Sequence, residues 1–141
     1  MNTTVDPTRF ALLARLLMSC VIKMWVFLTH WLMHFDEHVS YEMLCDVGTE
    51  ILPGIDTNPI RYNRGACDLL DGKNADQLTE EGYFIVGTLG SALDEHGRRG
   101  RTALRGHSSC SLVLAFLEGR VSEEKLGPWR RIVAAATLDD N

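Results

Sequence analysis

Residues 85–101, IVGTLGSALDEHGRRGR, carry the pattern from which the fold of this 141-residue chain is predicted. Apolar side chains recur through the first half of the stretch at helical spacing, which predicts an amphipathic helix. These side chains are Ile85, Val86, Leu89, Ala92 and Leu93. Gly97 follows, and glycine commonly ends a helix because it adopts the left-handed conformation without steric cost. With Gly100-Arg101 opening a second helix, the stretch predicts two helices that meet at a corner.

The Gly100-Arg101 corner resembles the first homology motif of the Bcl-2 family of apoptosis regulators, in which a Gly-Arg pair starts the central helix. Residues 44–50 (LCDVGTE) resemble the family's third homology motif, and residues 127–133 (GPWRRIV) resemble the second. The stretches occur in the family's order, which is harder to obtain by chance than any single motif. The resemblance implies an all-α fold, with residues 1–141 forming a single Bcl-2-like helical bundle.

Length and composition agree with one globular domain, since 45% of the residues are hydrophobic and 23% are charged. The net charge of −5 argues against a nucleic-acid-binding protein, which usually needs a basic surface to neutralise phosphates. Four arginines do cluster locally, and a solvated basic corner or a site for an acidic partner is the simpler interpretation. They are Arg98, Arg99, Arg101 and Arg105.

Cys20, Cys45, Cys67 and Cys110 are widely spaced, without the close pairs of zinc sites or redox motifs. Two disulfides are possible from the count, but no secretory signal precedes the cysteines, because Lys23 interrupts the first apolar run. We therefore expect a reducing compartment, the cytoplasm.

Residues 8–35 form the longest apolar stretch and predict one helix that is apolar on most sides. Arg15 and Lys23 split the stretch into runs shorter than the roughly 20 residues that a membrane span requires. A packed helix is therefore favoured over a transmembrane one. A membrane-surface or structural helical protein organised by this helix is the alternative function.

His30, His34 and His38 recur every four residues, with Asp36 and Glu37 between them. Histidines on consecutive turns can share a metal ion, but the sequence specifies no fourth ligand. We interpret the histidines as a polar stripe that faces water, and the sequence predicts neither a metal site nor a cofactor.

Further helices are expected over residues 39–51, 60–70, 77–95 and 101–118, and no long alternation of polar and apolar residues predicts a strand. Some features depart from the Bcl-2 pattern. The central helix would be polar in its first half, and the chain between Arg101 and Trp129 is too short for two full helices. The bundle would therefore be shortened between the central helix and the C-terminal motif.

The sequence contains no nucleophile with a base, no phosphate-binding glycine loop and no His-Glu-x-x-His helix. The resemblance instead implies a binding protein, an inhibitor of apoptosis that sequesters BH-3 helices of pro-apoptotic proteins in a surface groove. By this resemblance, Arg101 would pair with an aspartate of the ligand and Gly100 would let the ligand helix approach. The expected groove residues are Arg61, Tyr62, Leu69, Leu89, Leu93, Gly100, Arg101 and Leu104.

Compact size, divergent motifs and a chain that stops at Asn141 without a hydrophobic tail resemble a viral homologue that blocks host cell death. We expect it in the host cytoplasm without a stable transmembrane anchor, recruited to mitochondria through its partners. A homodimer is also expected, because the apolar side chains around the helix over residues 8–35 cannot all point inward. They are Trp25, Phe27, Trp31, Met33 and Phe35.

Overall fold

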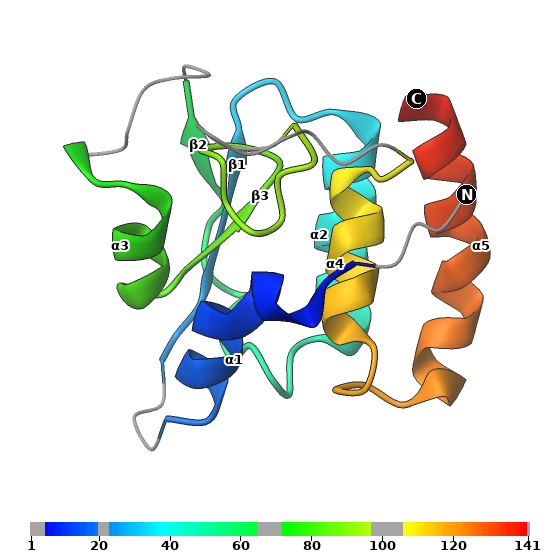
Figure 1. Ribbon diagram of the computed structural model, residues 1–141, viewed down its shortest axis with the longest axis horizontal. Coiled ribbons are helices and arrows are strands. Elements are labelled where there is room, and N and C mark those ends of the chain that lie inside the picture. The colour runs from blue at the N-terminus through cyan, green and yellow to red at the C-terminus, as the bar shows by residue number, and fades with distance from the viewer. Residues whose placement is uncertain (1–4, 20–22, 65–71, 97–105, 141) are drawn as a thin grey trace.

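The protein has a mixed α/β architecture built around a three-stranded parallel sheet, in the order β2-β1-β3. A computed structural model describes residues 5–19, 23–64, 72–96 and 106–140 (Figure 1). The strands are β1 (Val26–His30), β2 (Arg61–Asn63) and β3 (Tyr83–Val86). The prediction of an all-α, Bcl-2-like bundle is therefore wrong.

The helix predicted over residues 8–35 is divided into several elements. The 3-10 helix η1 (Pro7–Phe10) and α1 (Ala11–Leu17) come first, β1 follows, and α2 begins only at Phe35. In the sequence, a short buried strand and a buried helix segment both appear as a continuous apolar run. Parallel strands that are covered on both faces lack the alternation of polar and apolar residues by which a half-exposed strand is recognised. The aromatic and β-branched residues of Val26–His30 favour the strand.

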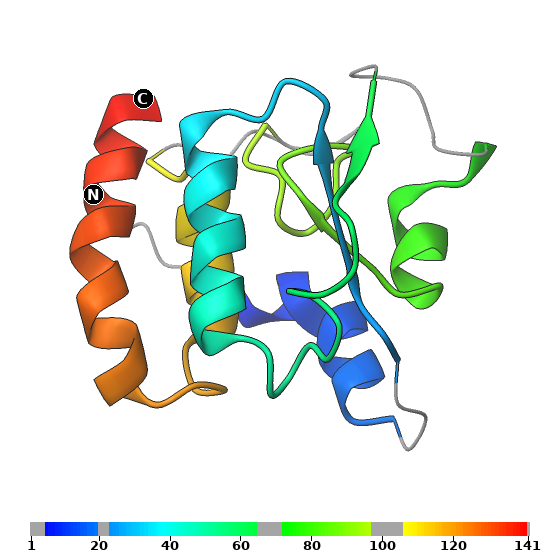
Figure 2. The same ribbon diagram turned by 180° about the vertical axis from the view of Figure 1, so that it is seen from behind.

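Helices cover both faces of the sheet, and Figures 1 and 2 show the layers from opposite sides. On one face lie α2 (Phe35–Val47) and α4 (Ser109–Leu117), with α5 (Glu123–Asp140) packed outside them. On the other face, α3 (Ala75–Glu80) packs against β3. The sheet is thus enclosed as in α/β proteins with parallel strands.

Successive strand residues face opposite sides of the sheet and enter two separate apolar clusters. Phe27 and Phe84 point into the main core beneath α2 and α4. Leu28 and Ile85 point into the smaller cluster, where Leu78 of α3 packs. Each fully buried side chain of this size stabilises the fold by roughly 1.5–3 kcal/mol.

The helix predicted over residues 77–95 is wrong, because α3 ends at Glu80 and β3 follows at once. Gly82, Gly87 and Gly90 have positive φ angles of 106°, 74° and 64°, so they form turns at both ends of β3. A helix was also predicted over residues 60–70, but residues 61–63 form β2 and residues 65–70 lie outside the described chain.

The helices predicted over residues 39–51 and 101–118 overlap with α2 and α4, although neither boundary agrees. Hydrogen bonds from capping side chains fix the residue at which a helix begins. Ser108 Oγ accepts a hydrogen bond from the Ser111 N–H (3.2 Å), and Ser111 Oγ accepts one from the Ser108 N–H (2.9 Å) at the start of α4. The Trp129 indole of α5 donates to Asp46 Oδ2 of α2 at 2.7 Å.

Within the described segments, no helix combines the length and apolarity that crossing a bilayer requires.

Candidate metal centre

The candidate site lies at the carboxyl ends of β1 and β3. The chain leaves β1 for β2 at one edge of the sheet and then passes back across β1 to β3 at the other edge. The direction of strand addition therefore reverses at β1. In open parallel sheets, ligands bind outside the carboxyl ends of the strands at such a reversal.

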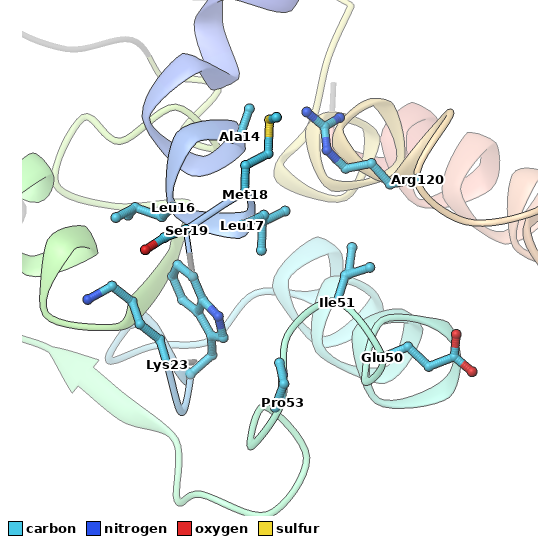
Figure 3. Close-up of a pocket in the computed structure, with 11 residues that line it drawn as sticks. Ala14, Leu16, Leu17, Met18, Ser19, Lys23, Glu50, Ile51, Pro53 and Arg120 are labelled. Atoms are coloured by element: carbon cyan, nitrogen blue, oxygen red, sulfur yellow. The ribbon is translucent and has the colours of Figure 1, made fainter. Parts of the chain in front are cut away.

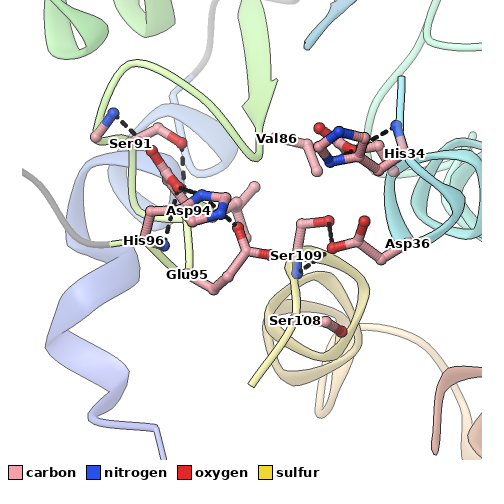
Figure 4. A network of polar contacts seen from close by, with 12 residues as sticks. His34, Asp36, Val86, Ser91, Asp94, Glu95, His96, Ser108 and Ser109 are labelled. Carbon is pink, nitrogen blue, oxygen red and sulfur yellow. Dashed lines mark hydrogen bonds and ion pairs between the residues drawn. The ribbon is translucent and has the colours of Figure 1, made fainter. Parts of the chain in front are cut away.

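Two acidic segments meet at this edge of the sheet. Asp36-Glu37 forms the first turn of α2, shortly after β1. Asp94-Glu95 follows β3 through a tight loop, in which Leu89 has a left-handed φ of 59° and the Gly87 N–H donates to the Leu93 carbonyl at 2.9 Å. The loop folds back on the strand end and thereby brings the second segment beside the first (Figure 4).

Asp36 and Glu95 are the buried centre of the site, with exposed fractions of 3% and 7%. Asp36 Oδ2 accepts hydrogen bonds from the Ser109 N–H at 3.1 Å and from Ser109 Oγ at 2.7 Å. Figure 4 shows Asp36 and Glu95 on either side of Ser109. Asp36 Oδ1 and Glu95 Oε1 are buried, and neither has a hydrogen-bond partner among the described residues. Two orphan acceptors in one buried site are unusual, because buried polar atoms are normally paired.

Burial, together with charge repulsion from the neighbouring Asp36 carboxyl group, raises the pKa of Glu95 to about 9. With no cation present, Glu95 therefore keeps its proton at neutral pH. The pair then has one negative charge in place of two.

The other two carboxylates, Glu37 and Asp94, are held by backbone N–H groups. Glu37 Oε2 accepts from the His34 N–H at 2.7 Å, and its Oε1 lies 3.5 Å from Thr29 Oγ1 at the end of β1. Asp94 Oδ2 accepts from the Gly90 N–H at 2.9 Å. These bonds fix the helix start and the loop, so Glu37 and Asp94 support the position of the central pair.

Two histidines form the solvent-facing rim. His96 Nδ1 lies 3.0 Å from Asp94 Oδ1 and 3.1 Å from Glu95 Oε1, while His34 Nδ1 lies 3.6 Å from Glu37 Oε2. The approach of His96 to Glu95 is a close contact of the two groups without a hydrogen bond between them. The side chains of His96 and His34 are 70% and 60% exposed. The site thus has buried carboxylates inside and accessible imidazoles outside.

Arg9 of η1 fixes the loop that carries Asp94 and Glu95. Its Nε donates to the Ala92 carbonyl at 2.7 Å, and its Nη2 donates to the Asp94 carbonyl at 3.0 Å. The guanidinium thus donates hydrogen bonds to the carbonyls of two loop residues, which hold the loop more firmly than one bond would. A residue far away in the sequence therefore positions the second acidic segment.

The donor atoms form two groups, each of which could hold a divalent metal ion. Ligand atoms of His34, Asp36 and Glu37 lie within 4.8 Å of one another, as do those of Asp94, Glu95 and His96. Mixed carboxylate and imidazole ligands favour zinc, manganese and iron. The sequence pattern predicts His34 on a polar stripe of one long helix, but β1 and α2 instead place it beside two carboxylates.

The groove residues expected from the Bcl-2 resemblance do not form one described surface. Leu93 is buried in the main core, Leu89 packs against the smaller cluster, and Arg61 and Tyr62 are exposed on β2. Arg61 donates to the Tyr83 hydroxyl at 3.2 Å. The remaining expected groove residues lie outside the described chain. These are Leu69, Gly100, Arg101 and Leu104.

A repeated tripeptide is the sequence signal for this site, and the predictions from sequence made no use of it. Asp36-Glu37-His38 and Asp94-Glu95-His96 follow the two neighbouring strands β1 and β3. Leu28 of β1 pairs with Ile85 of β3, and the two tripeptides begin at nearly the same distance after these partners, with a difference of one residue. The repeat indicates a site only when the apolar runs that precede its two copies are known to form adjacent parallel strands.

The chain was also compared with known proteins. No family model, curated protein or solved structure matches it.

Proposed function

We propose that this protein binds a divalent transition-metal ion between Asp36 and Glu95 and uses it to activate water for hydrolysis. The observation that carries the proposal is the pair of buried orphan oxygens, Asp36 Oδ1 and Glu95 Oε1, at the meeting point of two strand ends. Buried charges are normally paired or bound to a metal.

His96 is the proposed third ligand, because its Nδ1 lies 3.1 Å from Glu95 Oε1. Asp94 Oδ1 also lies 3.0 Å from this Nδ1, so a metal ion bound there would replace the Asp94–His96 contact. Since His96 is at the exposed rim, a coordination position toward solvent stays available for water. A bound metal ion lowers the pKa of such a water toward neutrality and so supplies a nucleophile.

A shared proton is the competing explanation for the Asp36–Glu95 pair. It compensates one negative charge, whereas a divalent cation compensates both and gives each orphan oxygen a partner. The two states exclude each other, because a metal ligand must be deprotonated. Metal binding should therefore release a proton, and a protein that only shares a proton would bind no metal.

Isothermal titration of the chelator-treated protein with Zn²⁺ or Mn²⁺ tests the site. We expect binding of one ion with proton release, measured as a dependence of the heat on the ionisation enthalpy of the buffer. Asp36→Asn and Glu95→Gln should each weaken binding at least tenfold. Glu42→Gln is the matched control, because Glu42 is an exposed carboxylate on the same helix.

His96→Ala and His38→Ala form a second matched pair, since both histidines are exposed and end the same tripeptide. Only His96→Ala should lower the affinity for the metal ion. Equal loss in the two variants, or unchanged affinity in Asp36→Asn, would show that the ion binds elsewhere. The hydrolytic step is tested with p-nitrophenyl acetate, whose metal-dependent turnover should disappear in Asp36→Asn.

Sequestration of BH-3 helices remains a separate prediction. The all-α fold that was expected with it is wrong, and Gly100 and Arg101 lie outside the described residues, so no described contact supports the groove. Titration with BH-3 peptides tests it directly.

A further inference from the structure

A cavity of about 480 Å³ lies at the other end of the sheet, near the start of β1. Its walls come from α1 and the residues after it, the entry to β1, the loop after α2, and the turn after α4 (Figure 3). A cavity of this volume, built from separate segments, has the size of a small-molecule site. It shares no residue with the candidate metal centre.

The walls are mainly apolar, and Figure 3 shows Leu17 and Met18 across from Ile51 and Pro53. Trp25 also lines the cavity, although only 2% of its surface is exposed. Its backbone N–H donates to the Pro53 carbonyl at 2.7 Å, and its ring packs edge-on against Phe84. The apolar wall is therefore fixed in place before any ligand arrives.

Two cations line the same cavity, Lys23 and Arg120. Lys23 Nζ donates to the Glu80 carbonyl, and Arg120 Nη1 donates to the Phe116 carbonyl at 2.9 Å while its guanidinium covers the Phe116 ring. Within the described segments, neither of them forms an ion pair with a carboxylate.

The acidic residue at the cavity, Glu50, is already compensated. Its carboxylate lies 3.8 Å from Lys125 Nζ, and its side chain is 84% exposed. Some other described cations do pair with carboxylates, as Arg15 does with Glu80 and Arg130 with Glu123. The cavity is thus a locally positive, apolar site on a chain with a net charge of −5.

We infer that this cavity binds an anionic amphiphile with a single alkyl chain, of the medium-chain fatty acid type. The alkyl chain would lie against Leu17, Ile51 and Pro53, and the carboxylate would pair with the Arg120 guanidinium. Apolar burial supplies most of the affinity, and the charge selects the head group. A neutral apolar ligand would leave Arg120 without a carboxylate partner, and a cationic one would be repelled.

Calorimetric titration with three probes below their micellar concentrations separates these contributions. Dodecanoate should bind one to one, dodecyltrimethylammonium at least tenfold more weakly, and acetate not measurably. Arg120→Met keeps an apolar stem and should reduce dodecanoate affinity about tenfold while leaving dodecyltrimethylammonium binding no weaker. Arg15→Met is the control, because Arg15 is an exposed cation on α1 that already pairs with Glu80. Equal affinity for the two dodecyl probes, or no effect of Arg120→Met, would overturn the inference.

A quenching measurement locates the ligand without altering the cavity. The chain has tryptophans at positions 25, 31 and 129, so the double variant Trp31→Phe, Trp129→Phe leaves Trp25 as the fluorophore. Dodecanoate brominated near the middle of its chain should quench Trp25 at the concentration at which it binds in the calorimeter. Binding without quenching would place the amphiphile on another surface and refute the assignment.

Discussion

Ser109 donates two hydrogen bonds to one carboxylate oxygen of Asp36, from its N–H at 3.1 Å and from its Oγ at 2.7 Å. The start of α4 thereby holds the start of α2. Both bonds go to Oδ2, so Oδ1 keeps its acceptor capacity for a cation.

Ser109→Ala should lower both metal affinity and stability. The variant keeps the N–H bond but removes the hydroxyl donor, and the loss of one such hydrogen bond destabilises by about 0.5–1.5 kcal/mol, or more when the acceptor is charged. Because Asp36 would be less well oriented, zinc affinity should fall about tenfold. Urea denaturation and calorimetry measure the two effects. Ser122→Ala removes a capping bond of 3.4 Å at the start of α5, so it should lower stability by a similar amount but leave zinc affinity unchanged.

Gly87→Ala should disturb the site through contact as well as backbone strain. A Cβ at this position would lie 2.9 Å from Glu37 Oε1, and the φ of 74° is unfavourable for alanine. Gly119→Ala separates the two effects, because Gly119 has a φ of 79° and a Cβ added there would meet nothing within 4 Å. We expect both variants to lose about 1 kcal/mol from the left-handed backbone. Only Gly87→Ala should lose more than that and also weaken zinc binding. Equal destabilisation would show that Glu37 moves aside freely.

The metal-free protein should lose stability as the pH rises. The pKa of Glu95 is raised in the folded state to about 9 from an ordinary value of 4.5. The stabilising contribution of the protonated group is therefore fully present below about pH 4.5 and is lost as the pH rises through about 9. Between these limits, this group contributes a slope of at most about 1.4 kcal/mol per pH unit. Urea denaturation in the presence of chelator measures the slope, which should be smaller in Glu95→Gln and unchanged in Glu42→Gln.

Phe27→Ala and Phe35→Ala distinguish the strand from the helix predicted over residues 8–35. Phe27 is fully buried in β1, whereas Phe35 is 59% exposed at the start of α2. Phe27→Ala should destabilise by about 3–5 kcal/mol, and Phe35→Ala by less than about 0.5 kcal/mol, as is usual for surface positions. Similar losses in the two variants would contradict the placement of these side chains. The homodimer remains a prediction, and sedimentation of Phe35→Ala beside the parent tests whether this exposed ring supports it.

The helical part of the fold was predictable in places, because α2 and α4 have helix-forming runs near the expected positions. The strands were not. Phe27-Leu28 and Phe84-Ile85 are apolar pairs whose members face opposite sides of the sheet, and such runs fit a buried helix equally well. The candidate site could not be predicted either, because it depends on β1 and β3 being neighbours. Once that pairing is known, the two Asp-Glu-His segments are an obvious pair.

The contact between Arg9 and the loop that carries Asp94 has a consequence for how the protein is made. As the chain leaves the ribosome, Arg9 emerges first and must wait for Asp94 before its guanidinium can bind that carbonyl. The bonds of Asp36 form later still, once Ser109 has been synthesised. A nascent chain with both acidic segments but without α4 therefore lacks the donors that orient Asp36. Competence to capture a metal ion should arise only late in translation, after most of the chain has left the exit tunnel.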